Sequence, residues 1–113
     1  MNDCLFCKII AKQIPANFVY ESEKIVAFPD IHPSAEVHLL IVPKKHIREI
    51  REIREIKGDK GNLLVEVYQA AMELVKENNL EDNLYRIVVN GGKAQQIKHL
   101  HFHLLGGEWK KFV

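Results

Sequence analysis

The sequence predicts an α+β fold, with an antiparallel sheet of about five strands, one long helix and one short helix. Short apolar runs typical of strands lie on both sides of a single long amphipathic stretch, and no linker or low-complexity segment divides the 113 residues. A chain of this length can bury roughly two-thirds of the surface that its unfolded form exposes, which is enough for one core. We therefore expect a single domain over residues 1–113.

The first half of the chain gives a local signal for each expected element. Apolar positions within residues 4–13, followed by Ile14-Pro15, favour a short helix, because the residue before proline avoids helical backbone angles. Two short runs, 18–20 and 24–28, predict a hairpin. The nearly continuous apolar run 37–42 predicts a central strand.

The second half predicts the long helix and the remaining strands. An Ile-Arg-Glu repeat over residues 47–56 favours one or two short solvated helices, to which we assign no chemistry. Apolar residues spaced three and four apart predict the main amphipathic helix over 62–78. A strand over 85–89, a turn over 90–94 and a last strand over 99–105 complete the expected sheet.

Composition limits the classes of partner. Sixteen Lys and Arg residues against fifteen Asp and Glu residues leave a net charge of +1. This near-neutral charge argues against nucleic-acid binding through many phosphates and against polybasic docking on membranes. No apolar run approaches the length of a membrane span, and the first four residues lack the features of a secretory signal. We expect a soluble, cytoplasmic protein with no nucleic-acid or membrane partner.

Two cysteines, Cys4 and Cys7, form a C-x-x-C pair near the amino end. Without an export signal a structural disulfide is not expected, which leaves half of a zinc site, a redox pair or two ordinary residues. A redox pair normally follows a strand, and only three residues precede this one. Six histidines are available to complete a metal site. Cys7 and His99 lie much further apart than the ~12–15 residues of a zinc finger, so any such site must be assembled across the fold.

The segment 99–105 is the most informative part of the chain, because His99, His101 and His103 alternate there with apolar residues. Alternate residues of a strand point to one face, so three imidazoles would project together. Stacked imidazoles repel one another once protonated, which disfavours a purely structural role. Two functional interpretations remain open. The row could hold a metal, or one imidazole could attack phosphorus while its neighbours and the loop 90–96 bind phosphoryl oxygens.

The heptapeptide H-L-H-F-H-L-L resembles the signature of the histidine triad (HIT) family, small nucleotide-binding hydrolases and transferases. Segments 4–10, 27–33, 38–46 and 88–91 also resemble the Hint-like branch of that family, in order. The resemblance implies the HIT fold, with the sheet continued across a homodimer. It also implies hydrolysis of purine nucleoside 5′-monophosphate derivatives (AMP or GMP type), phosphoramidates above all, through a nucleotidyl-histidine.

The resemblance further implies roles for individual residues. His101 looks like the nucleophile, with His99 and His103 as its phosphate-contacting neighbours. Asp30 resembles the carboxylate that holds the ribose hydroxyls, although a turn residue beside proline is an equal alternative. The other nucleotide contacts implied are Phe6, Ile9, Phe28, Ile31, Asn90, Gln95 and Gln96, of which the apolar ones could also be core.

The resemblance also completes a metal site. In similar bacterial proteins, two cysteines, a histidine after Pro-Lys-Lys and the first triad histidine can bind zinc, and here these correspond to Cys4, Cys7, His46 and His99. Two thiolates and two imidazoles form a closed tetrahedral set, which is typical of structural zinc. The alternative is two free thiols and a merely structural His46.

The loop 90–98 departs from the family pattern. It is about two residues shorter than usual for the family, and Gln96 stands where a hydroxyl commonly donates to the leaving group. This departure motivates a second interpretation, a nucleotide-binding regulatory module with little turnover. A metalloenzyme built on the histidine row and a nucleic-acid-binding zinc protein are more distant alternatives. The short tail 108–113 has no role that the sequence discloses.

Overall fold

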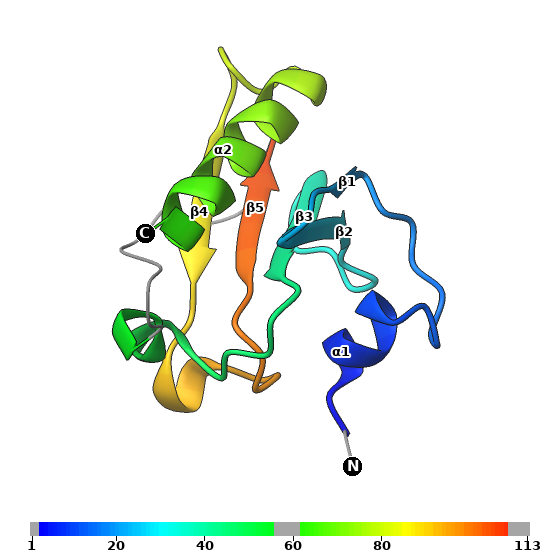
Figure 1. Ribbon diagram of the computed structural model, residues 1–113. Coiled ribbons are helices and arrows are strands. Elements are labelled where there is room, and N and C mark those ends of the chain that lie inside the picture. Colours follow the sequence, from blue (N-terminus) through cyan, green and yellow to red (C-terminus); the bar gives the residue numbers. More distant parts are fainter. Residues whose placement is uncertain (1–2, 56–61, 109–113) are drawn as a thin grey trace.

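The computed structural model describes residues 3–55 and 62–108, and in these ranges it confirms the predicted α+β class. Its five strands form one antiparallel sheet in the order β1-β2-β3-β5-β4. The elements, in chain order, are α1 (Leu5–Ile10), β1 (Tyr20–Glu21), β2 (Ile25–Pro29), β3 (Val37–Pro43), the 3-10 helix η1 (Ile50–Glu55), α2 (Asn62–Glu77), β4 (Tyr85–Val89), the 3-10 helix η2 (Gly92–Ala94) and β5 (Phe102–Gly106) (Figure 1).

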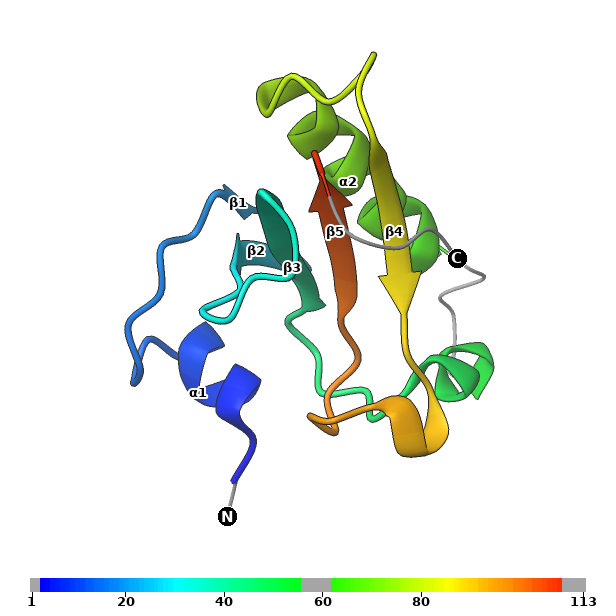
Figure 2. The ribbon, with the colours of Figure 1, turned by 180° about the vertical axis from the view of Figure 1, so that it is seen from behind.

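The two helices cover opposite faces of the sheet, because alternate residues of each strand point to opposite sides. Ile25 and Ala27 of β2 pack in the cluster that includes the buried side of α2. Val26 and Phe28, the alternate residues of the same strand, pack in a second cluster with Phe6 of α1. The view from behind shows α1 well separated from α2, beside the ends of β2 and β3 (Figure 2).

The long helix α2 follows the predicted periodicity. Its buried residues are spaced three and four apart, and they are Leu63, Val67, Ala70, Ala71, Leu74 and Val75. Just beyond the helix Asn79 adopts a left-handed conformation with φ of 57°, and the N–H of Leu80 bonds back to the carbonyl of Val75, a common way to end a helix. No helix in the described ranges is long and apolar enough to cross a membrane.

The repeat segment forms one short helix, the 3-10 helix η1, where one or two short helices were predicted. Its last predicted residue, Ile56, lies outside the described residues, as do residues 109–113 of the tail. One strand differs from the sequence prediction. The final strand begins at Phe102 and not at His99. Its partner β3 ends at Pro43, which has no N–H to continue a ladder, and the N–H of Leu100 bonds instead to the carbonyl of Ile47 at 2.6 Å.

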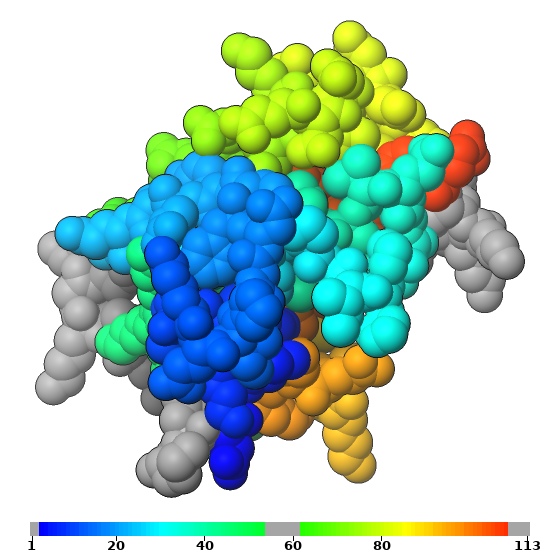
Figure 3. Space-filling view, turned by 90° about the vertical axis from the view of Figure 1, so that its right-hand side faces the viewer, coloured from blue at the N-terminus to red at the C-terminus, as the bar shows by residue number. Residues whose placement is uncertain are grey.

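Chain segments far apart in sequence meet at one end of the sheet. There the N-terminal segment with α1 lies beside the loop that leads into β5, as the space-filling view shows (blue and orange in Figure 3). Ile97 of that loop packs against the cluster that contains Phe6. This end of the sheet holds the polar side chains described next.

Candidate functional site

The three histidines of the predicted row lie on the side of the sheet that faces α1, but they serve two different clusters. The ring of Phe6 packs edge-on against the rings of His99 and His101, with centroids 5.9 and 5.0 Å away, and His103 pairs with Leu40, which packs in the same cluster as Phe6. The Nδ1 atom of His99 faces the cysteines. The rings of His101 and His103 lie 5.1 Å apart and form a separate centre.

The first cluster brings together Cys4, Cys7, His46 and His99. The Nδ1 atom of His99 lies 3.2 Å from Sγ of Cys4, 3.5 Å from Sγ of Cys7 and 3.2 Å from Nδ1 of His46, which in turn lies 3.3 Å from Sγ of Cys7. A tetrahedral site with bonds of ~2.0–2.3 Å places its ligand atoms ~3.3–3.8 Å apart. The geometry and the donor set of this cluster therefore fit a zinc ion.

The protonation of His99 is set by its surroundings. Its Nε2 lies 2.8 Å from the carbonyl oxygen of Pro43, which can only accept, so this nitrogen carries the proton. Nδ1 is left with a lone pair that faces the two cysteines, as a metal ligand requires. Both ring nitrogens of this fully buried histidine are thus engaged. The ring of His99 therefore has no nitrogen left for the phosphate contact that was expected of it.

Thiol chemistry also suits a metal ion. Burial raises the pKa of the Cys4 thiol, so without a nearby cation this sulfur keeps its proton. A bound metal ion would displace that proton, because thiolate and not thiol is the ligand.

The second cluster contains His101, in which the two ring nitrogens have exchanged roles relative to those of His99. Its Nδ1 lies 2.7 Å from the backbone carbonyl oxygen of His99 and must donate a proton to it. Nε2 is therefore unprotonated, and no hydrogen bond from the described residues engages it. A buried imidazole with a fixed ring and a lone pair at Nε2 is equipped to act as a nucleophile.

A chain of hydrogen bonds gives His103 the opposite protonation. The backbone N–H of Ser34 donates to Nδ1 of His38 at 2.9 Å, so the proton of that ring lies on Nε2. This Nε2–H donates to Nδ1 of His103 at 2.8 Å. His103 must then carry its own proton on Nε2, a buried atom with no hydrogen-bond partner among the described residues. His101 thus offers a lone pair beside a ring that offers an N–H.

Electrostatics keep these rings neutral. Burial lowers the pKa of His103 to about 4, the nearby His101 and His38 add to this effect, and Asp30 opposes it. Burial is also the main cause that lowers the pKa of His38 and of His101. Neutral rings at pH 7 agree with the protonation states that the hydrogen bonds assign.

Asp30 lies at the edge of this centre. Its Oδ1 accepts the N–H of His32 at 2.8 Å, and its Oδ2 lies 3.5 Å from Nε2 of His38. Asp30, His38 and His103 each place one potential metal ligand within 4.8 Å of the others. A metal would need Nε2 of His38 without a proton, whereas the Ser34 N–H at Nδ1 forces the proton onto Nε2. We therefore interpret this group as a hydrogen-bonded network and not as a metal site.

The apolar residues implied in nucleotide binding fall into two kinds. Phe6, Ile9 and Phe28 are buried and pack together, and the rings of Phe6 and Phe28 lie 5.7 Å apart at 69°. Ile31, by contrast, is 85% exposed on the loop after β2. Such an exposed isoleucine beside Asp30 is available to a ligand, while the buried residues form a wall.

The loop before β5 is held by Arg48 and Glu49 of the Ile-Arg-Glu repeat, a segment to which the sequence assigned no chemistry. The side chain of Gln95 is buried and donates to the carbonyls of Arg48 and Ile97 at 2.6 and 2.9 Å, and its Oε1 has no hydrogen-bond partner among the described residues. Glu49 is also buried, and its Oε1 accepts the N–H of Gly92 at 3.4 Å.

Asn90 directly follows β4, whose last pair is Val89–Phe102, and therefore lies near the level of His101.

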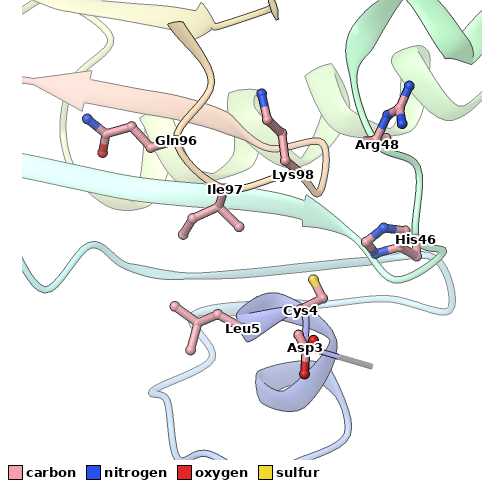
Figure 4. Close-up of a pocket in the computed structure, with 8 residues that line it drawn as sticks. All are labelled: Asp3, Cys4, Leu5, His46, Arg48, Gln96, Ile97 and Lys98. Atoms are coloured by element: carbon pink, nitrogen blue, oxygen red, sulfur yellow. The ribbon is translucent and has the colours of Figure 1, made fainter. Parts of the chain in front are cut away.

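A surface pocket of about 490 Å³ opens over the cysteine–histidine cluster. Figure 4 shows that three stretches of chain line it, namely the start of α1, the segment after β3 and the loop before β5. Gln96 and Lys98 from that loop face it together with Arg48. The lining includes the cluster residues Cys4 and His46 but not His101, so this pocket lies at the cysteine–histidine cluster and not at the His101–His103 centre.

Sequence reasoning missed two residues of the site, His38 and Glu49. His38 is the second residue of the otherwise apolar strand β3, and its alternation with Leu40, which packs on the α1 side, was the available signal. Glu49 lies in a charge repeat that resembles a solvated surface, and no local signal marks it as buried.

Comparisons with known proteins agree with this geometry. A family profile described as "Scavenger mRNA decapping enzyme C-term binding" matches residues 3–111. Protein HitA of Neisseria gonorrhoeae is 38% identical over 108 residues, covering 94% of this chain and 97% of that protein. A 14 kDa zinc-binding protein of Zea mays is 40% identical over 106 residues, covering 91% and 80%. Among solved structures, a HIT family hydrolase from Clostridium thermocellum superposes with a TM-score of 0.87 at 37% identity, covering 100% of this chain and 99% of that one.

Proposed function

The chain belongs to the histidine triad family, and we propose that it hydrolyses purine nucleoside 5′-monophosphate derivatives, phosphoramidates above all, with His101 as the nucleophile. The observation that carries this proposal is the opposite protonation of two adjacent rings. Nε2 of His101 has a lone pair, while Nε2 of His103 carries a proton. One can attack phosphorus while the other donates to an oxygen of the same phosphoryl group.

The reaction has two displacements. In the first, Nε2 of His101 bonds to phosphorus and the P–N bond to the leaving amine breaks, so that the amine departs with the electron pair and takes up a proton. In the second, water attacks the nucleotidyl-histidine, releases the nucleoside monophosphate and restores the lone pair of His101. One water molecule is consumed overall.

The other site residues hold the substrate in this scheme. Asn90 and the Nε2–H of His103 bind phosphoryl oxygens, and Asp30 accepts hydrogen bonds from the ribose hydroxyls. Gln95 supports the loop before β5 through its bonds to backbone carbonyls, and Gln96 lines the separate pocket over the cysteine–histidine cluster. The base packs against the apolar side chains of Phe6, Ile9 and Phe28, together with Ile31. His99 contributes its backbone carbonyl to the nucleophile rather than its ring.

The decisive experiment traps the intermediate. The protein is mixed with adenosine 5′-phosphoramidate and quenched in base, and intact-mass spectrometry followed by peptide mapping should locate one adenylyl group on His101. His101→Ala should show no adduct and no turnover while it still binds AMP. A wild-type protein that binds AMP but neither forms the adduct nor turns over would instead be the nucleotide-binding regulatory module.

Zinc is the metal that we propose for the cysteine–histidine cluster, where it would hold α1 to the loop before β5. The donor distances fit a tetrahedral ion, and similar plant proteins carry the name "14 kDa zinc-binding protein". Metal analysis of the purified protein should find one zinc per chain. Cys4→Ser should lower that content, whereas a wild-type chain isolated without metal at neutral pH would contradict the proposal.

A homodimer is proposed along β4, an edge strand of the sheet. The exposed side of α2 carries Val65, Tyr68 and Met72, and Tyr85 on β4 is also exposed. A second copy that paired with this edge would continue the sheet and could cover these apolar residues. Sedimentation velocity should give the mass of two chains, and Tyr68→Glu should shift the protein toward the mass of one.

A further inference from the structure

One peptide unit lies between the two clusters and bonds to both sides. Its carbonyl belongs to His99 and accepts the Nδ1–H of His101 at 2.7 Å. Its N–H belongs to Leu100 and donates to the carbonyl of Ile47 at 2.6 Å. Because a peptide group is planar and trans, fixing the direction of the N–H also fixes the direction of the carbonyl.

Both anchors of this peptide unit adjoin residues of the cysteine–histidine cluster. His99 supplies the carbonyl, and its side chain is itself a member of the cluster. Ile47, which accepts the N–H, directly follows His46, another member. The positions of His46 and His99 therefore determine where the carbonyl that holds the His101 ring points.

A second contact connects the same cluster to the same ring. Phe6 lies between Cys4 and Cys7 on α1, and its ring meets that of His101 at a centroid distance of 5.0 Å and an angle of 80°. α1 has only six residues, and a helix this short is not stable by itself. Its position therefore depends on its packing and on the two cysteines.

We propose that the Cys4–Cys7–His46–His99 cluster is a positioning device for the nucleophile, which acts through the His99–Leu100 peptide unit and through Phe6. With the four side chains held together, the His101 ring keeps the direction in which Nε2 faces the substrate. With the cluster open, the protein still folds and binds nucleotide, but the ring samples other directions. This inference rests on the proposed function, and it assigns the cluster a role beyond stabilising the fold.

The test compares Cys7→Ser with wild-type protein loaded with zinc. We expect Cys7→Ser to lose bound zinc and at least about tenfold in kcat, while its dissociation constant for AMP changes by less than about threefold. A readout independent of activity is the side-chain Nδ1–H of His101 in 15N-labelled protein. This signal should be visible in the loaded wild-type protein, because the 2.7 Å hydrogen bond protects it, and should be lost or broadened in the variant.

Two further variants separate positioning from stability. Val67→Ala removes buried volume beneath α2, on the opposite face of the sheet, and should lower the melting temperature without changing kcat or the His101 signal of the folded protein. His46→Cys keeps four zinc-binding side chains, so it should retain zinc and most of kcat. Removing zinc from wild-type protein with a chelator should lower kcat and weaken the His101 signal. Adding zinc back should restore both.

Each outcome decides a different question. If folded, zinc-free Cys7→Ser kept the wild-type kcat and the His101 signal, the positioning proposal would be wrong. If Cys7→Ser lost activity only in proportion to its unfolded fraction, with kcat of the folded protein unchanged as expected for Val67→Ala, the cluster would be structural alone. If wild-type protein showed no turnover at all, the proposed function would fail, while the His101 signal would still test the coupling.

Discussion

His99 and His101 are two residues apart, yet they are set up for opposite tasks. In His99 the carbonyl of Pro43 holds Nε2–H and leaves Nδ1 facing the cysteines. In His101 the carbonyl of His99 holds Nδ1–H and leaves Nε2 for the substrate. The comparison teaches that the partner of one ring nitrogen decides which lone pair the other offers, so the same side chain is prepared as a metal ligand in one place and as the proposed nucleophile in the next.

The largest expected effect separates these two histidines. His101→Ala should lower kcat by ~10⁴-fold or more, because the group that bonds to phosphorus is lost, and should leave the zinc content unchanged. His99→Ala should lose zinc and lower the melting temperature. Steady-state kinetics, metal analysis and thermal unfolding measure these effects. If the two variants failed in the same way, the assignment of separate roles would be incorrect.

His103 sharpens the comparison, since it is the donor beside the lone pair. His103→Ala should reduce kcat by ~10²–10³-fold, the usual effect of removing one donor to a charged oxygen. His103→Gln retains an N–H donor and should recover part of the loss. His32→Ala, at an exposed histidine, is the matched control and should behave as wild type. Equal losses in the alanine and glutamine variants would argue against a donor role.

The low pKa of His103 predicts how stability depends on pH. Burial and the neighbouring rings lower this pKa from the usual 6.5 to about 4, so on acidification the unfolded chain takes up the proton first. The contribution of His103 to the free energy of unfolding should therefore be constant above about pH 6.5, fall between about 6.5 and 4, and level off below. Urea unfolding at several pH values should show a flatter dependence for His103→Gln. An unchanged slope would contradict the assigned pKa.

Glu49 gives the smallest expected effect. Glu49→Gln weakens the acceptor for the Gly92 N–H, a contact worth ~0.5–1.5 kcal/mol, so KM should rise by about two- to tenfold if the loop binds phosphate. Glu73→Gln, on the exposed side of α2, is the control and should change nothing. A Glu49 variant with wild-type KM would show that the loop does not need this support.

The sequence predicted those parts of the fold that depend on local apolar pattern. The run 37–42 became β3 with one residue added, and the periodic segment 62–78 became α2 with its last residue omitted. The first hairpin strand was only partly predicted, because Phe18 packs against the α1 side and only Tyr20–Glu21 pairs with β2. The repeat segment was predicted as one or two short helices, and the structure has the 3-10 helix η1 there, whose three residues per turn match the period of the repeat.

The sequence predicted which residues form the site better than it predicted how they are arranged. The resemblance to the histidine triad family implied the four residues of the cysteine–histidine cluster, and the structure brings them together. The start of β5 at Phe102 could not be predicted, because it depends on Pro43 in a distant segment. The protonation of His103 was equally hidden, since it starts at the backbone of Ser34 and passes through His38. Contacts between remote segments leave no periodic signal in the sequence.

The cysteine–histidine cluster joins residues separated by 95 positions, Cys4 and His99. During synthesis on the ribosome, Cys4 emerges before His99, so this long ring of chain can close only after both segments are present. On the proposed positioning role, the carbonyl that holds the His101 ring takes its direction only after both of these segments have been synthesised and have met.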